Sequence, residues 1–171
     1  MKSQKQIQRA PDGGTRPLPS TTAPAGSHST MLWKRPGFLL RRLHQIHIAI
    51  FLEECGDEVT PVQYSVLQAL SSAGAADQSS LSRTVSLDRT NVADVLWRLE
   101  ERGFVKRVSF ANDRRMVLTE ITPPGRALLK RVSAASDRAH ARTIAALSAR
   151  DRASFLRTLQ HLIDAANGSH A

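Results

Sequence analysis

Apolar side chains recur at helical spacing in the first half of the chain. Residues 33–55 carry two adjacent apolar stripes, and burial against a second chain is the simplest account of so wide an apolar surface. Residues 60–73 predict a second helix that starts with a capping box, in which Thr60 stands before Pro61 and three residues before Gln63. The first helix is therefore a candidate dimerisation element.

Two more helices are predicted in the last third of the chain. Thr122 is the expected N-cap of a long, alanine-rich helix that runs to about Leu147. Ser148 caps a last apolar-faced helix that Gly168 ends. We expect residues 122–167 to connect with the first helix in a dimer interface, where the first and last helices of two chains interleave.

Between these outer helices, two short helices are predicted with a turn between them. Asp77 and Asp88 stand where N-caps are needed, and Gly103 ends the second short helix. The apolar positions that would bury this pair of helices are Leu81, Val85, Val92, Val95, Leu96 and Leu99.

After Gly103 the apolar pattern becomes strand-like. Residues 104–108 and 116–121 read as two short strands, and residues 109–115 supply the turn between them. Helix, turn, helix and then a basic hairpin is the order of a winged helix-turn-helix. The fold class predicted is thus mainly α with a small β-hairpin.

The second short helix would enter the major groove of DNA. Its first turn holds Arg89, Thr90 and Asn91, and Arg and Asn can read guanine and adenine. Arg98 could reach a phosphate, while Asp94, four residues earlier, could orient it. Ser79 and Ser80 lie near the start of the preceding helix. Each could either contact a phosphate or simply cap the helix, and the sequence leaves both roles open.

Charge supports a polyanionic partner. The net charge is +9 and the isoelectric point is about 11.0. Residues 102–115 hold five cations against only Asp113, and a surface that was basic by chance would not gather its charge on one hairpin. Arg114 and Arg115 would reach the DNA backbone or minor groove, and the sequence does not decide which arginine does so. Aromatic residues are few, at 5%, which disfavours a base-stacking platform.

The wing and its flanks resemble a known family. The run LEERGFVKR, followed by NDRR, then Ile121-Thr122 and Gly125, is similar to the signature of the MarR family of bacterial transcriptional regulators. That family usually has Leu at the position of Ile121. The resemblance implies a homodimer on a near-palindromic operator, released by a small aromatic ligand. It also implies that Asp113 and Arg115 form an ion pair that shapes the hairpin and leaves Arg114 as the groove contact.

The chain is expected to hold one domain behind a tail. Residues 1–30 are basic and rich in Pro, Gly, Ser and Thr, so we expect them to be disordered. Residues 31–171 form the single winged-helix domain, with residues 60–121 as its DNA-binding head. The first thirty residues lack the apolar core of a signal peptide, and no apolar run is long enough to span a bilayer, so a cytoplasmic protein is expected.

The first helix also carries a candidate effector site. Arg41, His44 and His47 recur at three-residue intervals among apolar neighbours, and an unpaired buried cation is costly. A carboxylate ligand would supply the partner, with Arg41 as a two-pronged donor. The ring of that ligand would lie against Trp33, Phe38 and Tyr64. The alternative is that Arg41 and its neighbour Arg42 pair with Glu53, Glu54 or acids of a second subunit.

Within the family, the first helix and the segment after it look most like regulators of aromatic-acid catabolism, including nicotinate-degradation repressors. The same branch includes regulators that answer to aromatic acyl-CoA thioesters. A free aromatic carboxylate, such as a hydroxylated nicotinic acid, is favoured here because a CoA site would need more exposed cations near the mouth of the pocket. Zinc at His44 and His47 with His140 or His161 lacks further motif support. A redox switch at Cys55 is disfavoured, because the acids around it should raise the thiol pKa. No cofactor is expected.

The sequence also bears on two classes of function outside transcriptional regulation. An enzyme would need a convergent nucleophile, base or metal set, and the sequence offers none at motif strength. A basic winged helix could instead coat DNA without sequence preference. A regulator should prefer one palindrome by roughly a thousandfold or more, whereas a coating protein should show little preference.

Overall fold

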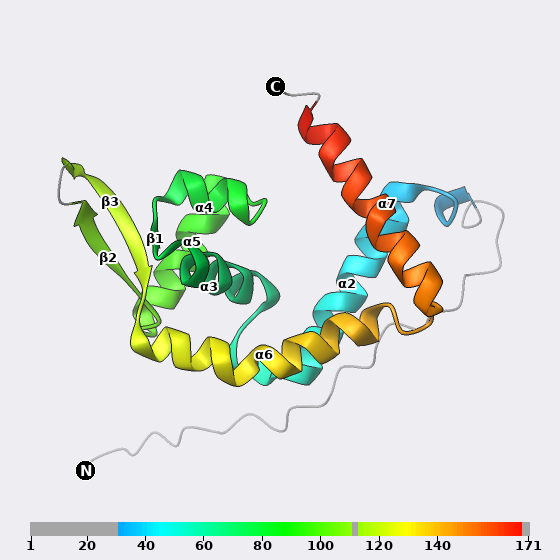
Figure 1. The fold of residues 1–171 in the computed structure, drawn as a ribbon, viewed down its shortest axis with the longest axis horizontal. Helices are drawn as coiled ribbons and strands as arrows, with labels where there is room; N and C mark the ends of the chain where they lie inside the picture. The colour runs from blue at the N-terminus through cyan, green and yellow to red at the C-terminus, as the bar shows by residue number, and fades with distance from the viewer. Residues whose placement is uncertain (1–30, 111–112, 169–171) are drawn as a thin grey trace, which may run out of the picture. The chain divides into compact units, whose positions relative to one another are not determined.

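The computed structural model describes residues 31–110 and 113–168 (Figure 1). By its internal contacts, one compact unit ends at Leu39 and a second begins at Leu40. The tail predicted to be disordered, residues 1–30, lies outside the described residues.

The architecture is mainly helical with a small antiparallel sheet, as predicted. The helices are α2 (Pro36–Cys55), the short 3-10 helix η1 (Gly56–Glu58), α3 (Pro61–Ala73), α4 (Gln78–Thr84), α5 (Arg89–Glu101), α6 (Pro123–Thr143) and α7 (Ala149–Gly168). The strands are β1 (Ala75–Ala76), β2 (Val105–Phe110) and β3 (Asp113–Ile121). Helices α4 and α5 with the β2–β3 hairpin are the expected winged helix-turn-helix (Figure 1).

Local capping sets most helix starts where the sequence placed them. Thr60 and Gln63 form the complete capping box of α3, with Pro61 at its first position. The hydroxyl of Thr122 accepts the backbone N–H of Gly125 at the start of α6, and Ser148 does the same for Asp151 in α7.

The sheet differs from the prediction in two ways. Its strand order is β1-β3-β2, and the two-residue strand β1 was not predicted. The hairpin strands are also longer than predicted, because residues 109–110 and 113–115, assigned to the turn, belong to β2 and β3. Backbone pairing needs no apolar side chains, so the ladder continues through polar residues to a bulge between Ser109 and Phe110.

One core joins the head to α6. Its largest fully buried side chains come from five helices and include Phe51, Leu67, Leu70, Leu81, Leu99 and Leu128. The sheet closes this core with Val105 and Ile121, which face each other across β2 and β3. Burying one such large apolar side chain contributes roughly 1.5–3 kcal/mol, so the core fixes α5 relative to α3 and α6.

The outer helices are more exposed. Helix α6 ends at Thr143, four residues before the predicted end, because turn-type backbone hydrogen bonds replace the helical repeat after Arg142. None of the residues described in α7 is buried, and Leu156, Leu162 and Ile163 are each more than half exposed. Helix α7 therefore presents an apolar face that the described chain does not cover.

Candidate DNA interface and effector region

The first turn of α5 is organised by its cap. The Asp88 carboxylate accepts the backbone N–H of Asn91 at 2.9 Å, and the Asn91 side-chain amide donates to its other oxygen. These hydrogen bonds, the backbone one first, hold the pKa of Asp88 below its usual value. Asn91 is thereby held in the first turn, and it lies exposed there beside Arg89 and Thr90.

Arg89 also links the two helices of the motif. Its Nη2 donates a 2.6 Å hydrogen bond to the hydroxyl of Ser79, and its backbone carbonyl accepts from Nε2 of Gln78 at 2.8 Å. Two hydrogen bonds therefore join the first turn of α4 to the first residue of α5. Gln78 was not among the residues predicted from the sequence.

The two serines of α4 have different partners. The Ser80 hydroxyl donates to the Asp77 carboxylate at 2.6 Å and is the main reason why the pKa of Asp77 is lowered. Asp77 also accepts the backbone N–H groups of Ser79 and Ser80, as a cap does. Ser80 thus serves the cap, whereas the Ser79 hydroxyl meets Arg89.

Further along α5, Asp94 and Arg98 form the expected pair. Their side chains lie 3.0 Å apart one turn along the helix, and both are more than half exposed. An exposed pair of this kind contributes little stability, so its effect is to orient the guanidinium of Arg98.

In the wing, two of the predicted basic residues are already paired. Lys106 lies 3.2 Å from Glu120 on β3, and Arg107 lies 3.2 Å from Glu100 near the end of α5. Arg114 and Arg115 lie on β3 close to the hairpin tip. The predicted Asp113–Arg115 ion pair involves side chains outside the described part of the structure.

On α2, the predicted effector residue His47 contacts two residues of α6. Its Nδ1 lies 2.8 Å from the Thr143 hydroxyl, and its ring stacks on His140 with centroids 5.0 Å apart. The single hydroxyl proton of Thr143 is donated to the Ala139 carbonyl, so Nδ1 of His47 must carry the proton that joins the pair. The Nε2 atom of a neutral His47 is then an acceptor.

Burial of the ring, followed by the charges of His140 and His44, lowers the pKa of His47. The neutral form is therefore favoured. Arg41 and His44, two of the other predicted effector residues on this helix, are exposed.

The predicted aromatic residues lie in different surroundings. Tyr64 is buried, packs against Phe51 with ring centroids 5.8 Å apart, and accepts a hydrogen bond from Gln68. Trp33 and Phe38 belong to the unit that ends at Leu39, where their rings meet edge to face at 5.3 Å.

Acids of α2 and η1 are bound by arginines of α6. Glu54 accepts from Arg138 at 2.8 Å and from Arg142 at 2.7 Å, and Arg142 also reaches Glu53. The hydrogen bonds from Arg142 and Arg138 lower the pKa of Glu54. Glu53 and Glu54, offered from the sequence as partners for Arg41 and Arg42, thus bind α6.

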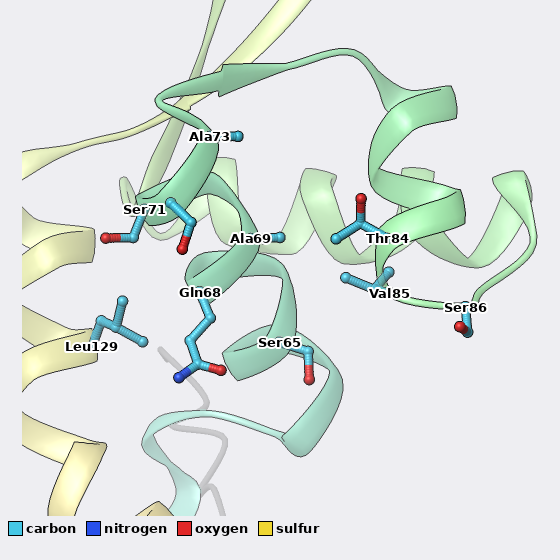
Figure 2. A pocket seen from close by; sticks show the side chains of 10 residues that line it. Ser65, Gln68, Ala69, Ser71, Ala73, Thr84, Val85, Ser86 and Leu129 are labelled. Atoms are coloured by element: carbon cyan, nitrogen blue, oxygen red, sulfur yellow. The ribbon is translucent and has the colours of Figure 1, made fainter. Parts of the chain in front are cut away.

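Two cavities lie close to these groups. An apolar one of about 420 Å³ is lined by His47, His140, Ala141, Thr143, Ile144 and Leu156. An open cleft of about 880 Å³ is lined by side chains of α3, the turn after α4, and α6 (Figure 2). Ser65, Gln68 and Ser72 make its α3 wall polar, and Gln68 connects it to Tyr64. The sequence did not predict this cleft.

The metal and redox alternatives receive no support from the geometry. Among the described residues, no group of three or more His, Cys, Asp or Glu side chains could hold a metal ion. Cys55 is buried, and burial followed by the charge of Glu54 raises its thiol pKa. A raised pKa keeps the thiol protonated and unreactive.

Comparisons with known proteins agree with this geometry. The model of the MarR family matches residues 59–117, which span the head and most of the hairpin. A solved structure of BpsR from Bordetella bronchiseptica is 30% identical, covers 77% of this chain and 94% of its own, and has a TM-score of 0.73. PcaV from Streptomyces coelicolor, solved with its natural ligand, is 33% identical over 79% of this chain and 96% of its own, also with a TM-score of 0.73.

This chain belongs to the MarR family. It is similar as well to the transcriptional repressor NicR of Pseudomonas putida, at 29% identity over 84% of this chain and 92% of the relative. The BpsR structure is described as a mechanism for regulation of DNA binding by 6-hydroxynicotinic acid. The family and these relatives are transcriptional regulators, and this chain is accordingly a DNA-binding winged-helix protein of the MarR family.

Several features of the MarR-family site escaped sequence reasoning. The turn between α4 and α5 holds Ser86 at a positive φ of 53°, where a glycine would be the expected residue. Bonds between distant segments, such as the one from Arg131 to Glu58, leave no signal in local spacing.

Within the described ranges, no helix has the length and apolar character needed to cross a membrane.

Proposed function

We propose that this protein is a repressor that binds a palindromic operator as a homodimer and is released by a small aromatic carboxylate, such as a hydroxylated nicotinic acid. The observation that carries the DNA-binding part is the exposed first turn of α5. There Arg89 is held by Ser79, and Asn91 is held by Asp88. Groups fixed in advance lose little freedom when they bind.

Each group at this surface has a proposed role. Arg89 reads guanine and Asn91 reads adenine, each contact being worth roughly 1–3 kcal/mol of discrimination. Thr90 meets a base edge or methyl group beside them, and Arg98, oriented by Asp94, binds a phosphate. The remaining proposed contacts are to the DNA backbone or minor groove, from Ser79, Arg114 and Arg115, whereas Ser80 is left out because its hydroxyl proton is donated to Asp77.

The dimer is supported by the exposed apolar faces of the outer helices. Leu156, Leu162 and Ile163 on α7 are all more than half exposed, and Leu40 on α2 is half exposed. A second copy that covers these faces removes the apolar surface from water. The two recognition helices then enter successive major grooves, roughly 34 Å apart.

For the effector, the proposal rests on α2 and on the relatives. Arg41 supplies the guanidinium fork for the carboxylate, and Nε2 of neutral His47 accepts a hydrogen bond from a ring hydroxyl or ring N–H. His47 lines a cavity of about 420 Å³, a volume within the range of small-molecule sites. Contributions of Trp33, Phe38 and Tyr64 to the ring-binding wall remain predictions from the sequence.

Release follows from the position of this site. Helix α2 is tied to α6 by Glu54 with Arg138 and Arg142, α6 packs on α3, and α3 contacts both α4 and α5. A ligand at α2 that favours a different spacing of the two recognition helices lowers operator affinity by its own difference in affinity for the two states.

The DNA-binding part is tested by comparing a palindromic operator from the protein's own upstream DNA with a scrambled duplex at fixed salt. We expect the operator to bind roughly a thousandfold more tightly. Equal binding to both duplexes would replace the regulator by a non-specific architectural protein.

The effector site is tested with matched variants of neighbouring arginines. We expect Arg41→Gln to keep operator affinity and to lose release by the aromatic acid. The control variant Arg42→Gln changes the next residue of the helix. The aromatic acid should still release this variant from the operator. The contrary result is that the acid releases Arg41→Gln from the operator and fails to release Ser72→Leu. That result would place the effector site in the cleft of Figure 2. Release by an acyl-CoA thioester, zinc or an oxidant in place of the acid would reject the carboxylate effector.

A further inference from the structure

The recognition helix carries one large, exposed apolar side chain, which the proposed contacts do not use. Trp97 lies near the middle of α5 with 53% of its surface exposed. Most other large apolar side chains that are exposed in the described part of the chain lie on α2 and α7, where a second copy would cover them. Trp97 instead belongs to the DNA-binding head, away from those helices in the sequence.

Trp97 lies on the same side of α5 as Thr90, which is proposed to contact a base in the major groove. Trp97 follows Thr90 by seven residues, and two turns of an α-helix take 7.2 residues, so both lie on one side of α5. That side also holds Asp94, which is exposed, and it is opposite the buried face formed by Val92, Leu96 and Leu99. The indole therefore lies on the face that meets the duplex.

Distance along the helix decides which part of the DNA it meets. A rise of 1.5 Å per residue places Trp97 about 12 Å along the helix from Arg89. In a helix-turn-helix complex the N-terminal residues of the recognition helix contact the base edges, and the major groove is about 12 Å wide. A side chain two turns beyond those residues is therefore next to the sugar–phosphate backbone that borders the groove.

We propose that Trp97 is a neutral anchor on the DNA backbone, packing its ring on deoxyribose and donating its indole N–H to a phosphate oxygen. Both interactions suit an indole, which has an apolar body and a single donor. The adjacent residue, Arg98, supplies positive charge that draws the same strand to the helix. The inference rests on the proposed operator binding and adds a contact that is independent of base sequence.

A neutral contact has a distinctive signature. Removing a cation that binds phosphate reduces the number of counterions released and so lowers the salt dependence of binding. Removing Trp97 should instead weaken binding while the salt dependence stays the same. The loss should be roughly tenfold or more, which corresponds to one hydrogen bond to a charged group.

The experiment measures operator and scrambled-duplex affinity over a salt series for the wild type, Trp97→Ala, Trp97→Phe and Arg98→Ala. We expect Trp97→Ala to lose the same factor on both duplexes with an unchanged salt slope, and Trp97→Phe to lose part of it. Arg98→Ala should lower the slope. Far-ultraviolet circular dichroism confirms that each variant is folded.

Fluorescence supplies an independent readout in a Trp33→Phe background, which leaves Trp97 as the only tryptophan. We expect its emission to change when duplex DNA is added. Wild-type affinity for Trp97→Ala with no change in emission would overturn the inference while leaving the proposed function in place. So would a loss confined to the operator, which would indicate base reading, or a change in oligomeric state, which would indicate contact with a second copy. If the wild type itself failed to bind the operator specifically, the proposed function would fail first.

Discussion

Nη2 of Arg102 donates a 2.7 Å hydrogen bond to the backbone carbonyl of Glu58. Arg102 is the C-cap that directly follows the recognition helix α5, and Glu58 is the last residue of the short helix between α2 and α3. Glu58 also binds Arg131 of α6 through its carboxylate, and this bond lowers its pKa. The end of the recognition helix is thus tied to the segment that joins α2, α3 and α6.

We therefore expect Arg102→Ala to lower the free energy of unfolding by about 1 kcal/mol, the usual net worth of one hydrogen bond. The variant also loses the stacking of the guanidinium over the Phe104 ring at 4.8 Å. Urea denaturation measures the change. Arg98→Ala, which removes an exposed pair on the same helix, is the control and should change stability by less than about 0.5 kcal/mol. Equal effects of the two substitutions would contradict a structural role for the Arg102–Glu58 bond.

A second prediction concerns Gly125 in the first turn of α6. A Cβ at this position would lie 2.2 Å from the Phe104 carbonyl oxygen, which already accepts the backbone N–H of Thr122. Gly125→Ala must therefore displace backbone at the junction of β2 and α6. We expect a loss of about 1–3 kcal/mol in unfolding free energy, despite the better helix propensity of alanine.

Thermal or urea denaturation of Gly125→Ala and Gly168→Ala makes the comparison direct. Gly168 lies in α7 with open space around its Cβ position, so its substitution should be neutral or slightly stabilising. A Gly125→Ala variant as stable as the wild type would show that α6 does not pack this closely on Phe104.

A third prediction follows from the lowered pKa of His47. Between that lowered pKa and the ordinary value of about 6.5, the unfolded chain binds more protons at this residue than the folded chain. Stability from His47 is therefore fully present above about pH 6.5 and is lost as the pH falls toward the lowered pKa. The His47→Gln variant should lack this part of the pH dependence.

Unfolding free energies at about pH 5.5 and about pH 8 test it, with the difference between wild type and His47→Gln isolating the residue. His161→Gln removes an exposed histidine of α7 and serves as the control. If wild type and His47→Gln lost equal stability on acidification, His47 would not be held neutral by its burial and by His140 and His44.

The sequence predicted what short-range chemistry determines. Asp77, Asp88 and Thr60 act as caps where they were expected, because a cap needs only a side-chain oxygen and the N–H groups two or three residues on. The apolar spacing of α5 likewise identified its buried face correctly. Such features depend on residues within one turn of each other.

What the sequence did not predict depends on distant partners. Strand β1 consists of Ala75 and Ala76, which have little strand preference and pair only because β3 lies beside them. The Glu54–Arg138 bond joins residues 84 positions apart. Exposed acids and arginines are too common in a sequence for such a pair to be identified without the fold.

The central claim, an operator complex released by an aromatic acid, is tested most directly by fluorescence anisotropy. A labelled duplex from the protein's own upstream DNA is bound at fixed salt and titrated with hydroxylated benzoic acids and pyridine carboxylates. We predict tight binding to the palindrome and its release by at least one hydroxylated acid at concentrations that leave a scrambled duplex unaffected. Tight binding that every acid in the panel leaves unchanged would contradict the claim.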